Sequence, residues 1–405
     1  MKAKITEPNY LTGFILVTTL FFMWGLSYGL VDVLNKHFQE ALQISKAQSG
    51  LIQAAYFGAY FVVALPAGIF ISKRGYKSGI IMGLSLYALG ALLFVPASIV
   101  MNFYFFLFAL FVLALGLGFL ETSANPYSSA LGNPETAEQR LNLSQSFNGL
   151  GQFIGPLIGG MFFFKTAGAA AQGNFDAVTL TYVVIACAVV GLIFLFLKTP
   201  LPDLRLIERE RDGANAKTHH ASMWSHKEFV TGVITLLFYV AAQVGVGAFF
   251  INLTVETWPN ATSQNAAYYL SIAMLAFMAG RFITTALMIK INAVKLLCIY
   301  AVINAILCAV ILIGCNYISV IAAIGIFFFM SIMFPTIFAM GVKNLGSHTK
   351  MGSSYMIMAI VGGAILPYFM GRVSDAFGTH YSYGLPLVCF LIVVAYSISY
   401  RKLAA

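Results

Sequence analysis

Charged residues are scarce in this sequence. They make up 9% of its 405 residues, whereas 60% of the residues are hydrophobic. A soluble globular protein carries about 25% charged residues, and a water-soluble fold of this length would leave much of its apolar surface exposed. The composition therefore excludes a soluble enzyme, a disulfide-rich secreted scaffold and a disordered chain. It predicts an integral membrane protein.

Candidate metal and redox ligands are scarce as well. None of the six histidines lies inside an apolar run, and all five cysteines lie inside such runs. Because the number of cysteines is odd and their surroundings are apolar, we interpret them as reduced packing residues. The sequence therefore predicts no metal site, no disulfide framework and no cofactor.

Long apolar runs, by contrast, are abundant. A helix that spans a bilayer needs about 20 consecutive apolar residues, and polar or Pro/Gly-rich breaks separate runs of that length. The runs do not alternate as the strands of a membrane β-barrel do. We predict an all-α integral membrane protein with twelve transmembrane helices, at 11–34, 47–71, 79–98, 103–131, 141–164, 177–198, 228–256, 265–289, 294–314, 317–342, 352–373 and 384–400.

One long hydrophilic stretch divides the predicted helices into two sets of six. It is rich in charge and contains Pro200 and Pro202, which is typical of a linker. We predict an N-terminal six-helix bundle over 1–198, a cytoplasmic linker over 199–227 and a C-terminal six-helix bundle over 228–405.

Basic residues are distributed unevenly between the two sides. Most of the 23 lysines and arginines fall in segments on the same side as the N-terminus. Since such residues collect on the cytoplasmic side of a membrane, we predict that both termini are cytoplasmic. The net charge of +9 then follows from topology and predicts no nucleic-acid partner.

The two halves resemble each other in the order of their prolines and glycines. The first half contains Asn125-Pro126, Gly132, Gly151, Pro156 and Gly160, and the second contains Phe334-Pro335, Gly341, Gly362, Pro367 and Gly371 at nearly the same spacing. Two six-helix halves in parallel repeat are the plan of the major facilitator fold. We therefore predict this fold, with the halves related by a pseudo-twofold axis.

Two carboxylates lie within predicted spans. Asp32 lies in the outer part of the first span and Glu121 lies near the middle of the fourth, while neither span contains lysine or arginine. A charged side chain at membrane depth costs about 2.5 kcal/mol or more, so it faces a partner or a wet cavity, or it takes up a proton. We favour proton coupling over a silent ion pair as the role of both residues.

Amide side chains gather near Glu121. Gln145, Asn148 and Gln152 share one face of the fifth span, and Asn125 lies one helical turn after Glu121. Amides and carboxylates can grip neighbouring sugar hydroxyls, although amides also hold membrane helices together. We favour a polar substrate cavity lined by these five residues.

Aromatic residues suggest further sugar contacts. Tyr239 and Gln243 lie one turn apart in the seventh span, and Trp24 lies about two turns before Asp32. An aromatic ring beside an amide suits the apolar face and the hydroxyls of a pyranose, but both are also common packing material. Arg281, near the end of a span, is interpreted as an interfacial anchor that snorkels.

Several motifs carry a resemblance to a known family. The sequence resembles the fucose–galactose–glucose:proton symporter family of the major facilitator superfamily, and within it the L-fucose permeases. The motifs are FFMWG (21–25), QSGLIQAAYFGAYF (48–61), LETSANPY (120–127), RLNLSQSFNGLG (140–151), FYVAAQVGV (238–246), FPTIFAMGVKNLG (334–346) and GSSYMIMAIVGGAILP (352–367).

The resemblance implies two essential carboxylates, which fall on Asp32 and Glu121, and a sugar cavity lined by Gln145 and Asn148. It also implies a monomeric carrier in the bacterial inner membrane. One departure, Tyr28 and Gly29 where these permeases carry asparagines, leaves the identity of the sugar open.

We therefore predict a secondary carrier, not an enzyme, that imports L-fucose or a related hexose with protons by alternating access. The partners expected are a small-molecule sugar, protons and the lipid bilayer. Three alternatives remain open. The carrier could be driven by sodium or take N-acetylglucosamine, glucose or galactose, or the chain could be a membrane-embedded sugar-modifying enzyme or a sugar sensor.

Overall fold

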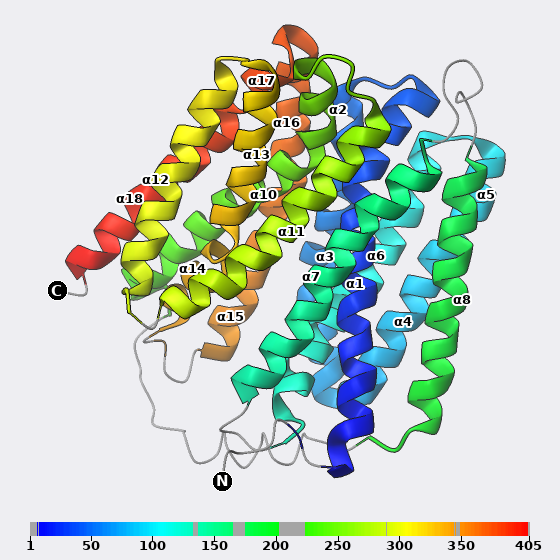
Figure 1. Cartoon of the computed structure of the whole chain (residues 1–405). Coiled ribbons are helices and arrows are strands. Elements are labelled where there is room, and N and C mark those ends of the chain that lie inside the picture. The colour runs from blue at the N-terminus through cyan, green and yellow to red at the C-terminus, as the bar shows by residue number, and fades with distance from the viewer. Residues whose placement is uncertain are drawn as a thin grey trace. The chain divides into compact units, whose positions relative to one another are not determined.

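The computed structural model of the chain consists of helices joined by short connections (Figure 1). It describes residues 6, 8–132, 137–164, 175–201, 223–288, 290–343, 345 and 349–403. The first half contains α1 (Pro8–Leu42), α2 (Lys46–Ser49), α3 (Leu51–Arg74), α4 (Tyr76–Leu92), α5 (Phe94–Val100), α6 (Phe103–Ala130), α7 (Ala137–Phe162) and α8 (Asp176–Lys198).

The second half begins with the short 3-10 helix η3 (Met223–Ser225). It continues with α10 (Lys227–Thr257), α11 (Ser263–Leu287), α12 (Ala293–Leu312), α13 (Asn316–Met330), α14 (Met333–Val342), α15 (Thr349–Met358), η5 (Ala359–Val361), α16 (Gly362–Phe377), α17 (Thr379–Ser382) and α18 (Gly384–Leu403).

The helices confirm the predicted all-α membrane fold. Among the described residues, 11 helical segments are long and apolar enough to cross a membrane. The remaining predicted span, 141–164, falls on α7, a helix of 26 residues. Each of the twelve predicted spans therefore coincides with one helix or with two or three consecutive helices.

Four predicted spans are interrupted, at Gly50, at Leu93, at Ser331 and Ile332, and at η5. The clearest case is the tenth span, which divides into α13 and α14 at Ser331 and Ile332. Pro335 has no N–H group, and its ring clashes with the carbonyl four residues earlier, which belongs to Ser331. The sequence pattern of hydrophobicity carries no sign of this break, because the residues on both sides are apolar.

Helix α1 is longer than its apolar run. The run predicts a span over 11–34, but α1 starts at Pro8 and continues to Leu42. Proline is favourable in the first turn of a helix, where its missing N–H group has no intrahelical partner to lose. At the other end Lys36 and Glu40 face each other at 3.6 Å one turn apart, which supports the helix beyond the apolar run.

The described residues group into two compact units by their contacts. Unit 1 consists of Met1–Gly29, Gly58–Gly155 and Gly173–Ala216, and unit 2 consists of Leu30–Phe57, Pro156–Gln172 and Lys217–Ala405. Helices α1, α3 and α7 each contribute to both units. The sequence-based bundles 1–198 and 228–405 stay a prediction, and most of the predicted linker, 202–222, lies outside the described residues.

Unit 1 is built around α4, which packs against α6 and α8. Glycines in the contact allow the backbones to approach, since a Cβ atom at Gly83 would lie 2.9 Å from the carbonyl oxygen of Gly116. Phe94 and Tyr182 stack in parallel with their ring centroids 3.7 Å apart. Dispersion between such closely packed surfaces holds membrane helices together, because lipid leaves little hydrophobic driving force between them.

Unit 2 is built around α10, which packs against α16, α18 and α14. The short helix α2 packs against α16 with similarly close backbones: a Cβ atom at Gly50 would lie 2.8 Å from the Cα of Tyr368, and one at Gly371 would lie 2.5 Å from the Cα of Ala47. These positions tolerate only glycine without a local shift.

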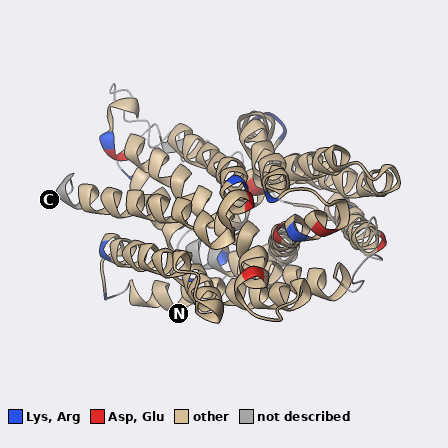
Figure 2. Ribbon diagram, turned by 90° about the horizontal axis from the view of Figure 1, so that it is seen from above, with Lys and Arg blue, Asp and Glu red and all other residues tan. Residues whose placement is uncertain are grey.

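The surfaces of both units are apolar. Large hydrophobic side chains such as Ile99, Phe194 and Ile321 are more than half exposed, and few charged positions interrupt the ribbons (Figure 2). A soluble monomer rarely exposes apolar surface of this extent. Such a surface is typical of helices that span a membrane.

The contact between α1 and α7 gives a first prediction. A methyl group at Gly151 would overlap the backbone of α1 at Phe22 and Leu26, so Gly151→Ala is expected to lower the free energy of unfolding by about 1–3 kcal/mol. Gly191→Ala on α8 is the matched control, because a Cβ atom there meets nothing within 4 Å. Thermal unfolding in detergent measures both, and equal stability of the two variants would contradict the close contact.

Candidate functional site

The first group of predicted site residues lies on α6 and α7 in unit 1. The side-chain Nε2 of Gln145 donates to Oδ1 of Asn125 at 3.2 Å, and the Nδ2 of Asn125 donates to the carbonyl oxygen of Glu121 at 3.1 Å. All three side chains are half-buried. The structure thus joins the amides of the fourth and fifth predicted spans into one polar line beside Glu121.

The polar line continues along α7 towards α1. The Nε2 of Gln152 donates to Oδ1 of Asn148 at 2.7 Å, and the Nδ2 of Asn148 donates to the carbonyl oxygen of Phe21 at 3.2 Å. This second bond is possible because Gly25 lets the backbone of α1 approach Asn148. Asn148 therefore holds two helices together, which is the alternative to sugar binding that the sequence left open for these amides. Gln152 is half-buried.

Trp24 is half-buried beside the same region of α1. Its ring packs against that of Phe21, with the centroids 6.0 Å apart and the planes tilted by 46°. Because Phe21 accepts the hydrogen bond of Asn148 through its carbonyl oxygen, Trp24 lies on the helix turn that anchors α7. The ring of Trp24 thus packs on the residue whose carbonyl oxygen bonds Asn148.

Glu121 carries no ionic partner in the described part of unit 1. The ion pairs found among the described residues join Lys36 to Glu40 and Lys46 to Glu256, and neither involves Glu121. The side chain is half-buried, so water or a ligand can reach it. A half-buried carboxyl can accept hydrogen bonds when ionised and donate one when protonated.

Asp32 has different surroundings in unit 2. It is 3% exposed, and its Oδ2 atom has no hydrogen-bond partner among the described residues. The carboxyl lies against α10, where a Cβ atom at Gly247 would lie 2.7 Å from Oδ2. A buried carboxylate without a cation is strongly unfavourable, so this arrangement favours a neutral, protonated carboxyl.

Tyr239 and Gln243 lie on the face of α10 that also carries Gly247, because the three positions are spaced by one turn each. Tyr239 is fully buried, and its hydroxyl donates to the carbonyl oxygen of Met330 at 2.9 Å. Gln243 is half-buried. The hydroxyl of Tyr239 thus serves helix packing, whereas the amide of Gln243 lies between Tyr239 and the turn that contacts Asp32.

The structure therefore divides the predicted site residues between the units. Unit 1 contains Trp24, Glu121, Asn125, Gln145, Asn148 and Gln152, and unit 2 contains Asp32, Tyr239 and Gln243. The described residues include no cluster of three or more histidine, cysteine or acidic side chains that could hold a metal ion.

Arg281 is not the snorkelling anchor expected from the sequence. Its guanidinium lies over the ring of Phe277, 5.0 Å from the centroid, and its Nε atom is buried without a hydrogen-bond partner among the described residues. A snorkelling arginine would extend its polar end into the interface. Its position as a basic residue inside a predicted span is the sequence signal that could have indicated this burial.

A second group that the sequence reasoning missed surrounds Asp32. Gln53 on α3 is the polar neighbour of the Asp32 carboxyl, and its Oε1 accepts a hydrogen bond from Nδ2 of Asn35 at 3.0 Å. Both amides are fully buried. Buried amides inside apolar segments are the signal that could have identified them.

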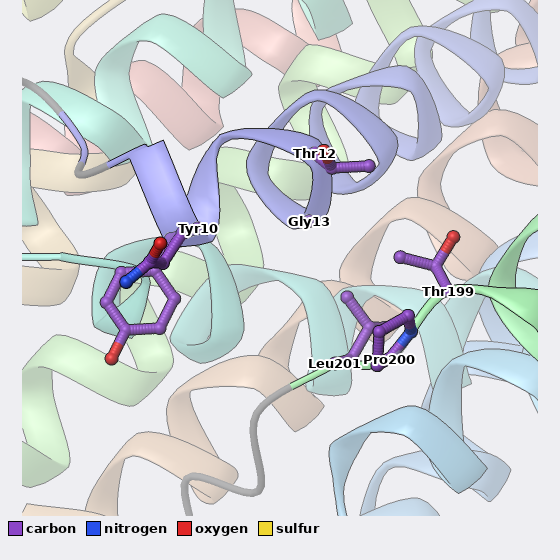
Figure 3. Close-up of a pocket in the computed structure, with 7 residues that line it drawn as sticks. Tyr10, Thr12, Gly13, Thr199, Pro200 and Leu201 are labelled. Carbon is purple, nitrogen blue, oxygen red and sulfur yellow. The ribbon is translucent and has the colours of Figure 1, made fainter.

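A pocket of about 170 Å³ lies elsewhere in unit 1 (Figure 3). It is formed by the start of α1 and by the residues at and beyond the end of α8, with Tyr10, Thr12, Thr199 and Pro200 among its lining. None of the predicted site residues contributes to it. The polar line and this pocket are therefore separate features of unit 1.

Comparison with known proteins shows the family of this chain. The sequence model of the Major Facilitator Superfamily matches residues 14–367. A glucose/galactose transporter of Brucella abortus biovar 1 (strain 9-941) is 38% identical over 397 residues, which cover 97% of this chain and 95% of that protein. An L-fucose-proton symporter of Escherichia coli (strain K12) is 36% identical over 409 residues, covering 96% and 93%.

The solved structures agree with the sequence comparison. The structure of FucP, a Major Facilitator Superfamily transporter in the outward conformation, is 35% identical and has a TM-score of 0.70, and the match covers 97% of this chain and 99% of that chain. The expected resemblance and the expected fold are both confirmed by these matches.

The contact between Asp32 and Gly247 gives the second prediction. Gly247→Ala is expected to lower the free energy of unfolding by about 1–3 kcal/mol, because the new methyl group overlaps the carboxyl. The same change in an Asp32→Ala background should have a much smaller effect, since the carboxyl is gone. Thermal unfolding of the four proteins in detergent gives the coupling between the two positions.

The control for this cycle is Gly68→Ala on α3, where a Cβ atom meets nothing within 4 Å. It should show no coupling to Asp32. An equal destabilisation by Gly247→Ala in both backgrounds would contradict the observed contact.

Proposed function

Since the chain belongs to the Major Facilitator Superfamily, whose members are transporters and not enzymes, we propose that it imports a neutral monosaccharide together with protons. The observation that carries this proposal is that Asp32 and Glu121 lie inside apolar helices without an ion-pair partner among the described residues. A carrier driven by protons needs such carboxyls, because they can bind and release a proton as their access to water changes.

Asp32 is proposed as the main proton switch. Its burial is compatible with the neutral form, while the ionised form requires water or a donor. Protonation from the outside would therefore allow the carrier to close around the sugar. Return of water from the inside would favour release of the proton, and alternating access would link the two steps.

Glu121 is proposed to bind the sugar and to share the coupling. Its backbone carbonyl accepts from Asn125, the first of the amides of the polar line, and its carboxyl is half-buried. Neighbouring amides and a carboxyl provide both donors and acceptors for the hydroxyls of a sugar ring. Because Asp32 and Glu121 both titrate in this scheme, the pair is best described by its joint proton uptake.

Aromatic and polar residues complete the proposed sugar site. Trp24 is held beside the amides by its contact with Phe21 and offers an apolar ring surface. Gln243 contributes a further amide, and Tyr239 shapes the same face of α10 with a ring whose hydroxyl is already bonded. These roles follow from position and chemistry, and single substitutions of each residue test them.

The substrate class is proposed to be L-fucose or a related hexose. The matched relatives are named for glucose/galactose in one case and for L-fucose in the other, so their names support a monosaccharide but divide on its stereochemistry. A screen of L-fucose, D-galactose, D-glucose and N-acetylglucosamine by thermal shift separates these sugars. Replacing sodium by choline in the uptake buffer tests the alternative coupling ion.

The proposed setting is the bacterial inner membrane, with the chain acting as a monomer and both termini in the cytoplasm. The uneven distribution of basic residues supports this orientation. In it, the connection between α10 and α11 faces the outside.

The third prediction concerns the two carboxyls. A pH gradient of one unit can support about tenfold accumulation of sugar in vesicles when one proton moves with each sugar. In Asp32→Asn vesicles accumulation should disappear, because the amide cannot release a proton, while exchange of internal for external sugar should persist. Glu121→Gln should reduce both processes, since its carboxyl is also proposed to contact the sugar.

Glu228→Gln is the matched control for these variants. Glu228 lies half-buried in the first turn of α10, where an acidic side chain is favourable, and it belongs to none of the proposed sites, so its loss should leave accumulation intact. Full proton-driven accumulation by Asp32→Asn or Glu121→Gln would refute the role of that residue.

The fourth prediction concerns orientation. A fluorescent protein fused to the C-terminus should be fluorescent in intact cells, because it folds in the cytoplasm. An epitope inserted at Asn260, in the connection between α10 and α11, should be accessible to antibody from outside without permeabilisation. The reverse labelling pattern would show the opposite orientation.

A further inference from the structure

A fully buried arginine in the first turn of α7 binds the end of α6. The Nε of Arg140 donates to the carbonyl oxygen of Ser128 at 3.2 Å, and its Nη2 donates to the carbonyl oxygen of Ser129. Both carbonyls belong to the last turn of α6, where backbone oxygens have no partner inside the helix and a cation is favourable. Arg140 therefore fixes the end of one site-bearing helix to the start of the next.

The connection after α6 leaves room for the guanidinium. Gly132 has a φ of +146°, a value that favours glycine, and a Cβ atom there would lie 2.8 Å from Nη1 of Arg140. The residue before it, Leu131, accepts a hydrogen bond from the hydroxyl of Thr6 at 2.8 Å through its carbonyl oxygen. The backbone of this turn is thus shaped around the arginine.

A second contact lies one turn further along α7. The hydroxyl oxygens of Ser144 and Ser128 lie 2.9 Å apart, and the hydroxyl of Thr18 on α1 lies 3.2 Å from that of Ser144. All three side chains are buried. Since a hydroxyl both donates and accepts, these residues join α1, α6 and α7 next to the arginine.

The polar line follows directly on these contacts. On α6, Asn125 lies one turn before Ser129 and accepts from the hydroxyl of that serine at 3.1 Å through its carbonyl oxygen. On α7, Gln145 follows Ser144 and donates to Oδ1 of Asn125 at 3.2 Å. The bonds from Arg140, Ser144 and Gln145 to α6 are therefore three successive contacts between the same two helices, which we call the ladder.

Helix α6 is weakened within the ladder. Pro126 lies inside the helix and has no N–H group, so the carbonyl oxygen of Thr122 lacks its usual partner. The end of α6 is therefore less firmly tied to the part that carries Glu121. Because the proline directly follows Asn125, a bend at this point would change the separation of Asn125 and Gln145.

We propose that Arg140 is a positioning residue for the sugar site, which it maintains by holding α6 and α7 in the register that brings Asn125 and Gln145 together. The inference rests on the proposed function, because these two amides are proposed to bind the sugar. Arg140 acts through the ladder and not on the sugar. Its planar guanidinium carries donors in a rigid fork, which suits the two adjacent carbonyls of α6.

The experiment compares two substitutions at this position. Arg140→Lys keeps the charge but replaces the fork by a single ammonium group, and Arg140→Gln removes the charge. Equilibrium binding of radiolabelled L-fucose, D-galactose and D-glucose is measured in detergent, and initial rates of uptake are measured in proteoliposomes. Thermal unfolding of each variant without sugar reports its stability separately.

The expected result is weaker sugar binding with little change in turnover. The Kd of the sugar that the wild-type chain binds should rise by about twofold to tenfold in Arg140→Lys, the equivalent of one hydrogen bond, and by at least as much in Arg140→Gln. The KM of uptake should rise in parallel, while the maximal rate should stay within about twofold of wild type. The proposed proton switch, Asp32, belongs to unit 2 and not to the ladder.

A double-mutant cycle tests whether Arg140 acts through the ladder. Gln145→Ala removes the last contact, so Arg140→Lys should raise the Kd of this variant no further. If Gln145→Ala binds sugar too weakly for a Kd, the same cycle is measured by thermal unfolding, where the two substitutions should be less than additive. Ser144→Ala removes one oxygen atom of the ladder and should also raise the Kd, which keeps the proposal testable if neither Arg140 variant folds.

Lys77→Gln is the matched control. The ammonium group of Lys77 donates to the carbonyl oxygens of Leu197 and Thr199 at the end of α8, at 3.3 and 2.9 Å, so it also binds the end of a helix in unit 1. The proposed sugar site lies on α1, α6, α7 and α10, and neither α4 nor α8 contributes to it. Lys77→Gln should therefore leave the Kd unchanged, whatever its effect on thermal unfolding.

The outcomes separate this inference from the proposed function. If the wild-type chain binds and accumulates sugar but the Arg140 variants keep the wild-type Kd, Arg140 has no positioning role, even if their thermal stability falls. An equal rise in Kd with and without Gln145, or in Lys77→Gln, overturns the inference as well. If the wild-type chain binds none of the three sugars, the proposed function fails and the positioning role falls with it. A higher Kd that disappears in the Gln145→Ala background, with Lys77→Gln unchanged, supports the inference.

Discussion

The cost of a carboxylate away from water is the constraint on which this structure depends. Asp32 and Glu121 interrupt apolar helices, and no cation among the described residues offsets either charge. The two carboxyls differ in exposure, since Asp32 is 3% exposed and Glu121 is half-buried. The same chemical group therefore behaves differently in the two places. Burial favours the neutral form of Asp32, whereas the half-buried carboxyl of Glu121 can bond a ligand in either form.

Glycine determines where the polar groups can meet. Gly25 and Gly151 allow α1 and α7 to approach until the amide of Asn148 reaches the carbonyl of Phe21. Gly247 likewise leaves the space that the Asp32 carboxyl occupies. In a membrane, helices held by close packing need such small residues. The polar residues and the glycines therefore form one pattern, in which each amide or acid is placed by a neighbouring residue that lacks a side chain.

The sequence predicted the helices well because a bilayer-spanning segment has a local signature in its length and hydrophobicity. It did not predict the break caused by Pro335, since both sides of the break are apolar. Nor could it predict partners far along the chain: Glu256 and Asp375 contact Lys46 from 210 and 329 residues away. The prediction that Arg281 snorkels to the interface was wrong for the same reason, because the burial of a side chain depends on neighbours that only folding brings together.

Lys46, Glu256, Asp375 and Thr379 form a cluster that ties α2 to α10, α16 and α17. The strength of this cluster fits a structure that has to open repeatedly. The side chains of Lys46 and Glu256 are 24% and 32% exposed, and an exposed ion pair contributes about 0–1 kcal/mol. The two backbone bonds to Asp375 add a contribution like that of a helix cap, about 0.5–2 kcal/mol. Reversing a two-state population from 1:99 to 99:1 needs about 5.5 kcal/mol. A cluster of this size can therefore be overcome by binding a proton and a sugar, whereas a deeply buried ion pair in its place would hold the helices together through every cycle.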